Sequence, residues 1–355
     1  MKFKLDMQKI LAPAALIILY VFFSIFGKNF AGGYTLKTIL ESSYYVGFMA
    51  FGVTFVIISG GIDLSLGSNM MCSALLGCYA YKAWGWPLWA GLILCLLVGT
   101  LFGFLNGVMI AKFKLPPFIA TLGTQMVTLG LGSIITNVQT QRFPTVGAKD
   151  AWFKEVFYRC NLDKFLNQIF PNGDFSAFKG FPIGAVYLLI AFILAVFLLN
   201  KTKFGRYALA IGSNEEAARL SGVKTDNWKI LIYTICGLFC AIAGIFYAAC
   251  YTTVIPGTGN GLEMNGITAV IIGGTSMAGG SGSIVGTMIG VFFMSVLKNG
   301  LPSVGLQSQW QTFFTGLVVI GAVLLDQARI RSASRIKTPK EKKLKTAKTS
   351  VKSNE

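Results

Sequence analysis

The stretch SGGIDLSLGS, residues 59–68, decides how the chain is organised, because it places a carboxylate between two apolar segments. Gly60 and Gly61 let the backbone leave helical geometry. Asp63 or Ser65 can then accept hydrogen bonds from the free N–H groups of the next helix, whose positive end suits a carboxylate. The stretch therefore predicts a tight, capped turn between helices. In the alternative interpretation, the broken segment lines an aqueous pathway, as unwound backbone inside membranes often does.

The composition places this turn inside a membrane protein. Of the 355 residues, 54% are hydrophobic and only 13% are charged, and the mean hydropathy is +0.64. Soluble domains carry about a quarter charged residues. We therefore expect an all-α, polytopic membrane protein with lipid as its main solvent. The seven cysteines form no Cys-x-x-Cys pair and the chain has no histidine, so neither a metal site nor a disulfide framework is predicted.

About ten apolar segments are long enough to cross or nearly cross a bilayer. They are residues 10–27, 41–59, 67–85, 87–111, 118–137, 183–200, 229–252, 262–278, 283–299 and 308–326, some of them interrupted by glycine-rich, re-entrant pieces. Lys and Arg concentrate at both ends of the chain and in the loop 201–228, which orients these three parts toward the cytoplasm. We expect one transmembrane domain over residues 1–326, with an outer loop at 138–182 that carries one or two amphipathic helices. A basic, disordered tail is expected over residues 327–355.

The loop 201–228 contains the pattern of a short, well-delimited helix. Ser213 followed by Glu216 predicts a capping box, and Gly222 is placed to end the helix. Glu215 and Arg219 form a predicted i,i+4 ion pair. A short rigid helix on such a loop is suited to receive a push from a soluble motor, although an ordinary loop helix would show the same pattern.

Several chemistries are disfavoured by what the sequence lacks. It contains no G-x-x-x-x-G-K-[ST], H-E-x-x-H or G-x-S-x-G motif, so no catalytic residue is predicted and a membrane enzyme is disfavoured. Few acidic residues lie within the apolar segments, whereas ion-coupled carriers usually need embedded charges. Energy for transport, if it is used, must then come from another subunit.

Four stretches together resemble the permease subunits of the ribose/galactose-type ABC sugar importers, over about residues 40–326. They are SGGIDLSLGS (59–68), GFLNGVMIAKFKLPPFIATLGT (103–124), TKFGRYALAIGSNEEAARLSGV (202–223) and LEMNGITAVIIGGTSMAGGSGSIVGTMIG (262–290). The resemblance implies a bacterial inner-membrane permease without a cofactor of its own, since ATP and Mg are bound by a partner ATPase. It also implies an external sugar-binding protein and a second permease copy, either as a homodimer or as a similar subunit.

The resemblance assigns the 213–222 segment to ATPase coupling, and the chemistry of a sugar pathway suggests a second set of residues. The predicted ATPase-coupling residues are Gly205, Arg206, Ser213, Asn214, Glu215, Glu216, Ala217, Ala218, Arg219, Leu220, Ser221 and Gly222. The predicted pathway or gate residues are Gly60, Gly61, Asp63, Ser65, Asn106, Thr124, Gln125, Glu263, Asn265, Gly273, Gly274 and Thr275. Uncharged hydrogen-bonding side chains beside aromatic faces suit a sugar, although interhelical hydrogen bonds would use the same residue types. The chain departs from the family at Glu263-Met264-Asn265, where Glu-Leu-Asp is common, so a second acidic role there is not expected.

The predicted function is therefore a non-catalytic permease subunit of an ATP-driven importer for a monosaccharide. Ribose is the leading substrate, while galactose, xylose, a furanosyl signalling molecule and a nucleoside remain open. The alternative function is a stand-alone secondary carrier or facilitator for a small polar solute.

Overall fold

The computed structural model describes residues 7–335, except 146, 162, 164–166 and 168–179. Its first helices are α1 (Met7–Phe26), α2 (Gly33–Ile58), α3 (Leu66–Lys82), α4 (Leu88–Ala111), α5 (Pro117–Ile135), α6 (Trp152–Phe157) and α8 (Gly184–Lys201). The chain continues with α9 (Lys203–Ser213), α10 (Glu215–Leu220), α11 (Thr225–Tyr251), α12 (Leu262–Ile272), α13 (Ile284–Ser303) and α14 (Ser308–Arg335). Two short strands, β1 (Gln141–Arg142) and β2 (Thr253–Val254), pair antiparallel.

The prediction of an all-α polytopic membrane protein is confirmed. Within the described residues, seven helices are long and apolar enough to span a bilayer, namely α2, α4, α5, α8, α11, α13 and most of α14. Helices α1, α3 and α12 correspond to the other three predicted segments. Helix α3 falls short in length, and its serines and asparagine suit it to the interior of the bundle, where most of its residues are buried.

Helix α2 is the central element of the bundle. Nearly all of its apolar span is buried, and it packs against α8, α11, α12 and α13. Around it, glycines allow close helix pairs, among them the glycines of two Gly-Thr-x-x-Gly stretches at 99–103 and 286–290. A Cβ added at Gly103 of α4 would lie 2.8 Å from the Cα of Gly237 of α11, and one added at Gly290 of α13 would overlap the carbonyl oxygen of Ala269 of α12.

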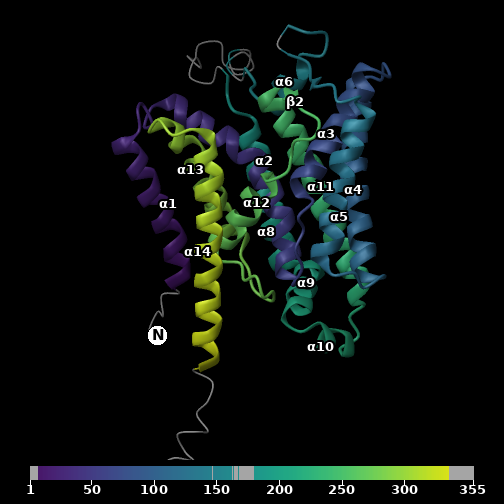
Figure 1. Cartoon of the computed structure of the whole chain (residues 1–355), viewed down its shortest axis with the longest axis vertical. Helices are drawn as coiled ribbons and strands as arrows, with labels where there is room; N and C mark the ends of the chain where they lie inside the picture. Colours follow the sequence, from purple (N-terminus) through teal and green to yellow (C-terminus); the bar gives the residue numbers. More distant parts are fainter. Residues whose placement is uncertain (1–6, 146, 162, 164–166, 168–179, 336–355) are drawn as a thin grey trace, which may run out of the picture.

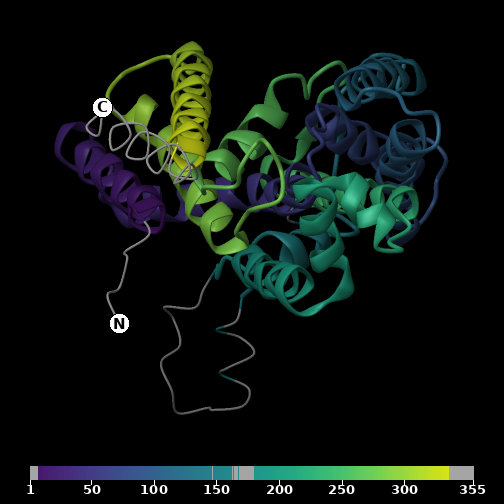
Figure 2. The same ribbon diagram turned by 90° about the horizontal axis from the view of Figure 1, so that it is seen from below.

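The two ends of the bundle differ in what they carry (Figure 1). Helices α9 and α10, the start of α1 and the end of α14 share the lower end, whereas α6 and β2 lie at the upper end. Seen from below, α1, α13 and α14 form one side of the molecule and α3, α4 and α5 form the other (Figure 2). Hereafter the end that carries α10 is called the inner end, and the opposite one the outer end.

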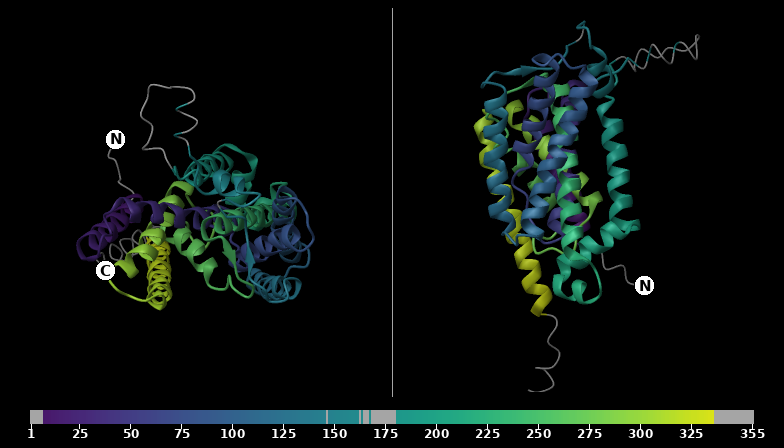
Figure 3. Two further views of the ribbon diagram at one scale, coloured as in Figure 1. Left: turned by 90° about the horizontal axis from the view of Figure 1, so that it is seen from above. Right: turned by 90° about the vertical axis from the view of Figure 1, so that its right-hand side faces the viewer.

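Helix α14 extends beyond the bundle at the inner end (Figure 3). It continues to Arg335, so residues 327–335 of the predicted tail are helical. Residues 336–355 lie outside the described part of the chain. The same holds for residues 146, 162, 164–166 and 168–179 of the predicted outer loop, whereas α6 lies in its described part.

Candidate functional site

The chain re-enters the bundle between α2 and α3. Gly60 adopts a left-handed conformation (φ +80°), and residues 61–65 form neither helix nor strand before α3 begins at Leu66. Asp63 is only 2% exposed, and its Oδ1 accepts hydrogen bonds from the backbone N–H of Ser65 (2.8 Å) and from the Ser65 hydroxyl (2.6 Å). The N-cap of α3 is Ser65, whose side chain makes no capping bond to the helix. The carboxylate thus orders the backbone that leads into α3.

Hydrogen bonds connect this turn to α4 and α5. Asn106 of α4 donates from Nδ2 to Oγ of Ser65 at 2.9 Å, and its Oδ1 accepts from the hydroxyl of Thr124 at 2.5 Å. One turn along α3, the hydroxyls of Ser68 and Thr128 lie 2.8 Å apart. All of these side chains are buried, so the bonds tie three helices together in a medium without competing water.

A second broken segment precedes α12. Glu263, only 3% exposed, accepts a hydrogen bond from the backbone N–H of Gly261, which lies 3.0 Å from each of its carboxylate oxygens. Gln125 of α5 donates from Nε2 to Glu263 at 3.3 Å and to Asn260 at 3.1 Å. Helix α5 therefore contacts the second broken segment directly through Gln125, and Thr124 is connected to the first one through Asn106 of α4.

The starts of α3 and α12 meet inside the bundle. A Cβ added at Gly67 would overlap the carbonyl oxygen of Gly259 and would lie 2.9 Å from Oε2 of Glu263. Two helix N-termini, each with a positive end, thus converge beside two carboxylates. We call the side chains gathered here the central polar cluster: Asp63, Ser65, Asn106, Thr124, Gln125 and Glu263.

The other predicted pathway residues lie elsewhere. Asn265 is buried within α12, while Gly60 and Gly61 belong to the turn at the inner end of α2. Gly273, Gly274 and Thr275 begin the loop between α12 and α13, where Thr275 Oγ1 accepts from the N–H of Ser283 at 3.4 Å. The predicted set therefore divides between the central polar cluster and the inner end of the bundle.

Sequence reasoning missed two polar side chains of α3. Ser68 bonds to Thr128, and Asn69 donates from Nδ2 to the carbonyl oxygen of Gly99 at 3.1 Å. Both follow Ser65 at the i+3 and i+4 positions, which share one face of a helix. This helical spacing of polar residues could have predicted that both side chains lie on the same face as Ser65.

At the inner end, α9 and α10 form the segment predicted to couple to an ATPase. The cap of α10 is Asn214, whose Oδ1 accepts from the N–H of Ala217 at 2.9 Å, so the capping box predicted at Ser213 is wrong by one residue. An amide caps as well as a hydroxyl, and Ser213 instead completes α9. The predicted end of the helix is confirmed, because Gly222 is left-handed (φ +85°) just after it.

The ion pairs of α10 also differ from the prediction. Arg219 pairs with Glu216, three residues before it, and not with Glu215. Glu215 lies 2.6 Å from the ammonium of Lys229 on α11. Because the helix begins at residue 215, its first side chain points back toward α11 and leaves Arg219 with the i,i+3 partner.

Most of the predicted coupling residues face solvent. Leu220 is 81% exposed, although it is a large apolar side chain. The other exposed members are Arg206, Ser213, Asn214, Glu216, Ala217, Arg219, Ser221 and Gly222, while Gly205 and Ala218 are buried and Glu215 is half-buried. Leu220 and Ala217 are thus the exposed apolar side chains of α10.

The end of α9 packs against the two glycine-rich loops. A Cβ added at Gly212 would overlap the carbonyl oxygen of Ile58, which accepts a hydrogen bond from the N–H of Gly280 at 2.8 Å. A Cβ added at Gly279 would lie 2.9 Å from the Cα of Gly60. We call this backbone-to-backbone contact of Gly60, Gly212, Gly279 and Gly280 the inner junction.

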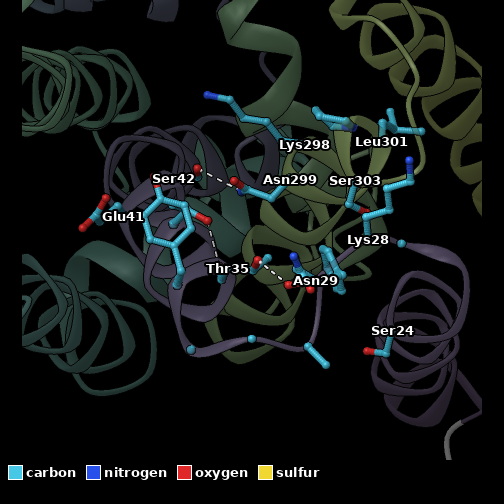
Figure 4. A pocket seen from close by; sticks show the side chains of 18 of the residues that line it. Ser24, Lys28, Asn29, Thr35, Glu41, Ser42, Lys298, Asn299, Leu301 and Ser303 are labelled. Carbon is cyan, nitrogen blue, oxygen red and sulfur yellow. Dashed lines mark hydrogen bonds between the residues drawn. The ribbon is translucent and has the colours of Figure 1, made fainter.

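A pocket of about 1190 Å³ opens at the outer end (Figure 4). Lys298 of α13 donates to the hydroxyls of Tyr45 and Tyr251, each at 2.8 Å, and Asn299 donates to Oγ of Ser42 at 3.1 Å. The sequence analysis did not single out Lys298. A lone lysine within an apolar segment was a signal for a polar recess.

Comparison with known proteins gives consistent matches. A family model described as "Branched-chain amino acid transport system / permease component" matches residues 35–323. The ribose import permease protein RbsC of Bacillus subtilis (strain 168) is 37% identical over 323 residues, which cover 91% of this chain and 94% of that protein. The fructose import permease protein FrcC of Rhizobium meliloti is 35% identical, over 89% of this chain and 86% of its own length. The autoinducer 2 import system permease protein LsrC of Yersinia pestis (strain Pestoides F) is 33% identical, over 91% and 85% respectively.

Proposed function

Because this chain belongs to the family of the branched-chain amino acid transport system permease component, we propose that it is the membrane-spanning subunit of an ATP-driven sugar importer. Ribose is the leading substrate. The observation that carries this proposal is the 37% identity to a ribose import permease over nine-tenths of both chains. The chain itself is a transport component and not an enzyme.

The central polar cluster supports a polyhydroxylated solute. It offers amide, hydroxyl and carboxylate groups from α3, α4, α5 and α12, and sugar hydroxyls both donate to and accept from such groups. The two helices that begin inside the bundle resemble the discontinuous helices at the binding sites of other transporters. We place the cluster, with Gly60, Gly61, Asn265, Gly273, Gly274 and Thr275, on or beside the translocation route.

The exposed helix α10 supports docking of an ATPase at the inner end. Leu220, Glu216 and Arg219 project from a short helix whose cap and terminal glycine fix its shape. The inner junction lies directly behind it, at the ends of α2 and of the loop after α12. ATP and Mg are bound by that partner. Closure of the ATPase would push α10 toward the inner junction and change the side of the membrane to which the translocation route is open.

We further propose that the inner end faces the cytoplasm of a bacterial inner membrane. The basic residues of the 201–228 loop and of both chain termini support this orientation. An external sugar-binding protein then meets the opposite end, where α6 and the pocket around Lys298 lie. A second permease, a copy of this chain or a similar subunit, completes the assembly, and the exposed apolar surface of α14 is suited to such a contact.

Reconstitution with the ATPase and the binding protein in proteoliposomes tests this function. We expect uptake of labelled ribose only when ATP and the loaded binding protein are both present. Replacing Glu216 and Arg219 together by alanine is expected to reduce sugar-stimulated ATP hydrolysis about tenfold, a usual magnitude for coupling between sites. Lys114→Ala, which breaks an exposed 2.8 Å ion pair with Asp226 at the same end, is the matched control and should leave hydrolysis unchanged.

The results that would contradict the proposal are equally specific. Uptake by the isolated chain without ATP would identify a facilitator or secondary carrier. Unchanged stimulation in the double alanine variant would remove the role given to α10. Competition by fructose, galactose, xylose or a nucleoside against labelled ribose, in uptake and on the binding protein, identifies the substrate if ribose is not the one carried.

A further inference from the structure

The loop between α12 and α13, residues 273–283, is held from two opposite sides. We call it the inner loop. On one side, Gly279 and Gly280 pack against the end of α9 in the inner junction, and the N–H of Gly280 donates to Ile58 of α2. Because these contacts are between backbones, with no long side chain to deform, a displacement of α9 must displace the inner loop as well.

On its other side, the inner loop is bound to α14 by one carboxylate. Oδ2 of Asp326 accepts hydrogen bonds from the hydroxyl of Ser276 and from the backbone N–H of Met277, each at 3.1 Å. Asp326 is buried, although it lies in the last turns of an apolar span. Burying a carboxylate next to an apolar span costs free energy. The hydrogen bonds from the inner loop offset part of this cost.

The remainder of α14 is weakly held by the bundle. Only 11% of its apolar span is buried, compared with 61% for α13 and 94% for α2. Near Asp326, a groove of about 470 Å³ separates α14 from α1 and α12, with Leu11, Ile271 and Val318 among its apolar lining. At this depth the two hydrogen bonds of Asp326 form a directional link between α14 and the inner loop.

We propose that Asp326 is a positioning residue that transmits the movement of the α9–α10 segment to α14. The route runs from α10 through α9 to the inner junction, across the inner loop, and through Ser276 and Met277 to Asp326. This inference rests on the proposed function, since it assumes that an ATPase moves α10. It adds a specific output to that function: α14 and the inner loop shift together, while the better-buried α13 stays with the core.

Two isosteric substitutions separate the hydrogen bonds of Asp326 from its charge and its bulk. Asp326→Leu removes both acceptors, and the apolar groove beside residue 326 can accommodate leucine. Asp326→Asn retains one carbonyl oxygen that Ser276 and Met277 can share. Thr315→Val is the matched control, because it also replaces a buried polar group on α14, and the Thr315 hydroxyl has no partner among the described residues.

The measurement is sugar transported per ATP hydrolysed, in the complete complex in nanodiscs and proteoliposomes, together with the thermal unfolding midpoint of each variant. For Asp326→Leu we expect the ratio of sugar transported to ATP hydrolysed to fall about tenfold, which is a usual magnitude for coupling between sites. The thermal unfolding midpoint should change little. Asp326→Asn should retain most of the ratio, and Thr315→Val all of it.

A wild-type ratio in Asp326→Leu would overturn the inference, and so would an equal loss in the leucine and asparagine variants. If Asp326→Leu unfolds, Ser276→Ala replaces it as the test, because it removes one of the two hydrogen bonds of Asp326. An unchanged ratio of sugar transported to ATP hydrolysed in Ser276→Ala would also overturn the inference. Failure of the proposed function is a different result, because in that case the wild-type complex itself shows no ATP-dependent uptake.

Discussion

Asn106→Leu is a direct test of the central polar cluster. Asn106 is fully buried and bridges two elements, donating to Ser65 before α3 and accepting from Thr124 of α5. Leucine has a similar branched shape without donor or acceptor. The substitution therefore removes both bonds and leaves the Thr124 hydroxyl facing an apolar side chain, whereas the hydroxyl of Ser65 keeps its bond to Asp63.

The expected cost follows from these two bonds. Interhelical hydrogen bonds in membrane proteins contribute on average about 0.6 kcal/mol, and at most about 1.7 kcal/mol. A buried donor left without an acceptor costs about 1–3 kcal/mol. Loss of the Ser65 bond and stranding of the Thr124 hydroxyl together predict a decrease of about 2–4 kcal/mol in the free energy of unfolding for Asn106→Leu.

The double variant Asn106→Leu/Thr124→Val tests the reasoning. Because valine removes the stranded hydroxyl, we expect the double variant to recover about 1–2 kcal/mol relative to Asn106→Leu. The assay is reversible unfolding in mixed micelles, for the wild type, both single variants and the double variant. Distant, independent sites add to within about 0.3–0.5 kcal/mol, so costs that add within that margin would refute the bridging role of Asn106.

Three further predictions concern the inner end, the Asp63 turn and α6. Gly212→Ala forces α9 away from α2 and should cost about 1–3 kcal/mol, whereas Gly123→Ala, where an added Cβ meets nothing within 4 Å, should be neutral or slightly stabilising in thermal unfolding. Asp63→Asn weakens the charge-assisted hydrogen bonds from Ser65, so it should cost about 0.5–1.5 kcal/mol and retain transport; lost transport at unchanged stability would instead place this side chain on the route. Burial lowers the pKa of Lys154, so the unfolded chain binds more protons between that lowered pKa and the ordinary lysine value. Stability should therefore rise with pH across this window, and Lys154→Met should abolish the rise.

The helices were predictable from sequence because the length of an apolar run is a local property. The segments that became α2, α4 and α11 needed no knowledge of their partners. The end of α10 at Gly222 was predictable for the same reason, since a left-handed residue after a helix is a matter of backbone sterics. The start of α10 was less predictable, because Ser213 and Asn214 are both good N-cap residues. The packing of α9 decides between them.

The meeting of α3 with α12 was not predictable from local pattern. Gly67 and Gly259 are far apart in sequence, and their contact depends on how α5 and α11 pack around them. The sequence suggested that Asp63 either caps a helix or lines a route, but not that Glu263 would lie beside the same helix start. Likewise, Lys298 has two tyrosine partners on different helices, and no spacing rule connects them.

The glycine contact between α4 and α11 has a mechanical consequence. Because Gly103 and Gly237 bring two backbones together, no layer of side chains lies between them that could change rotamer and let the helices slide. The contact between α4 and α11 is therefore rigid. We therefore expect α4 and α11 to move together as one unit, while the shift proposed above is confined to α14 and the inner loop.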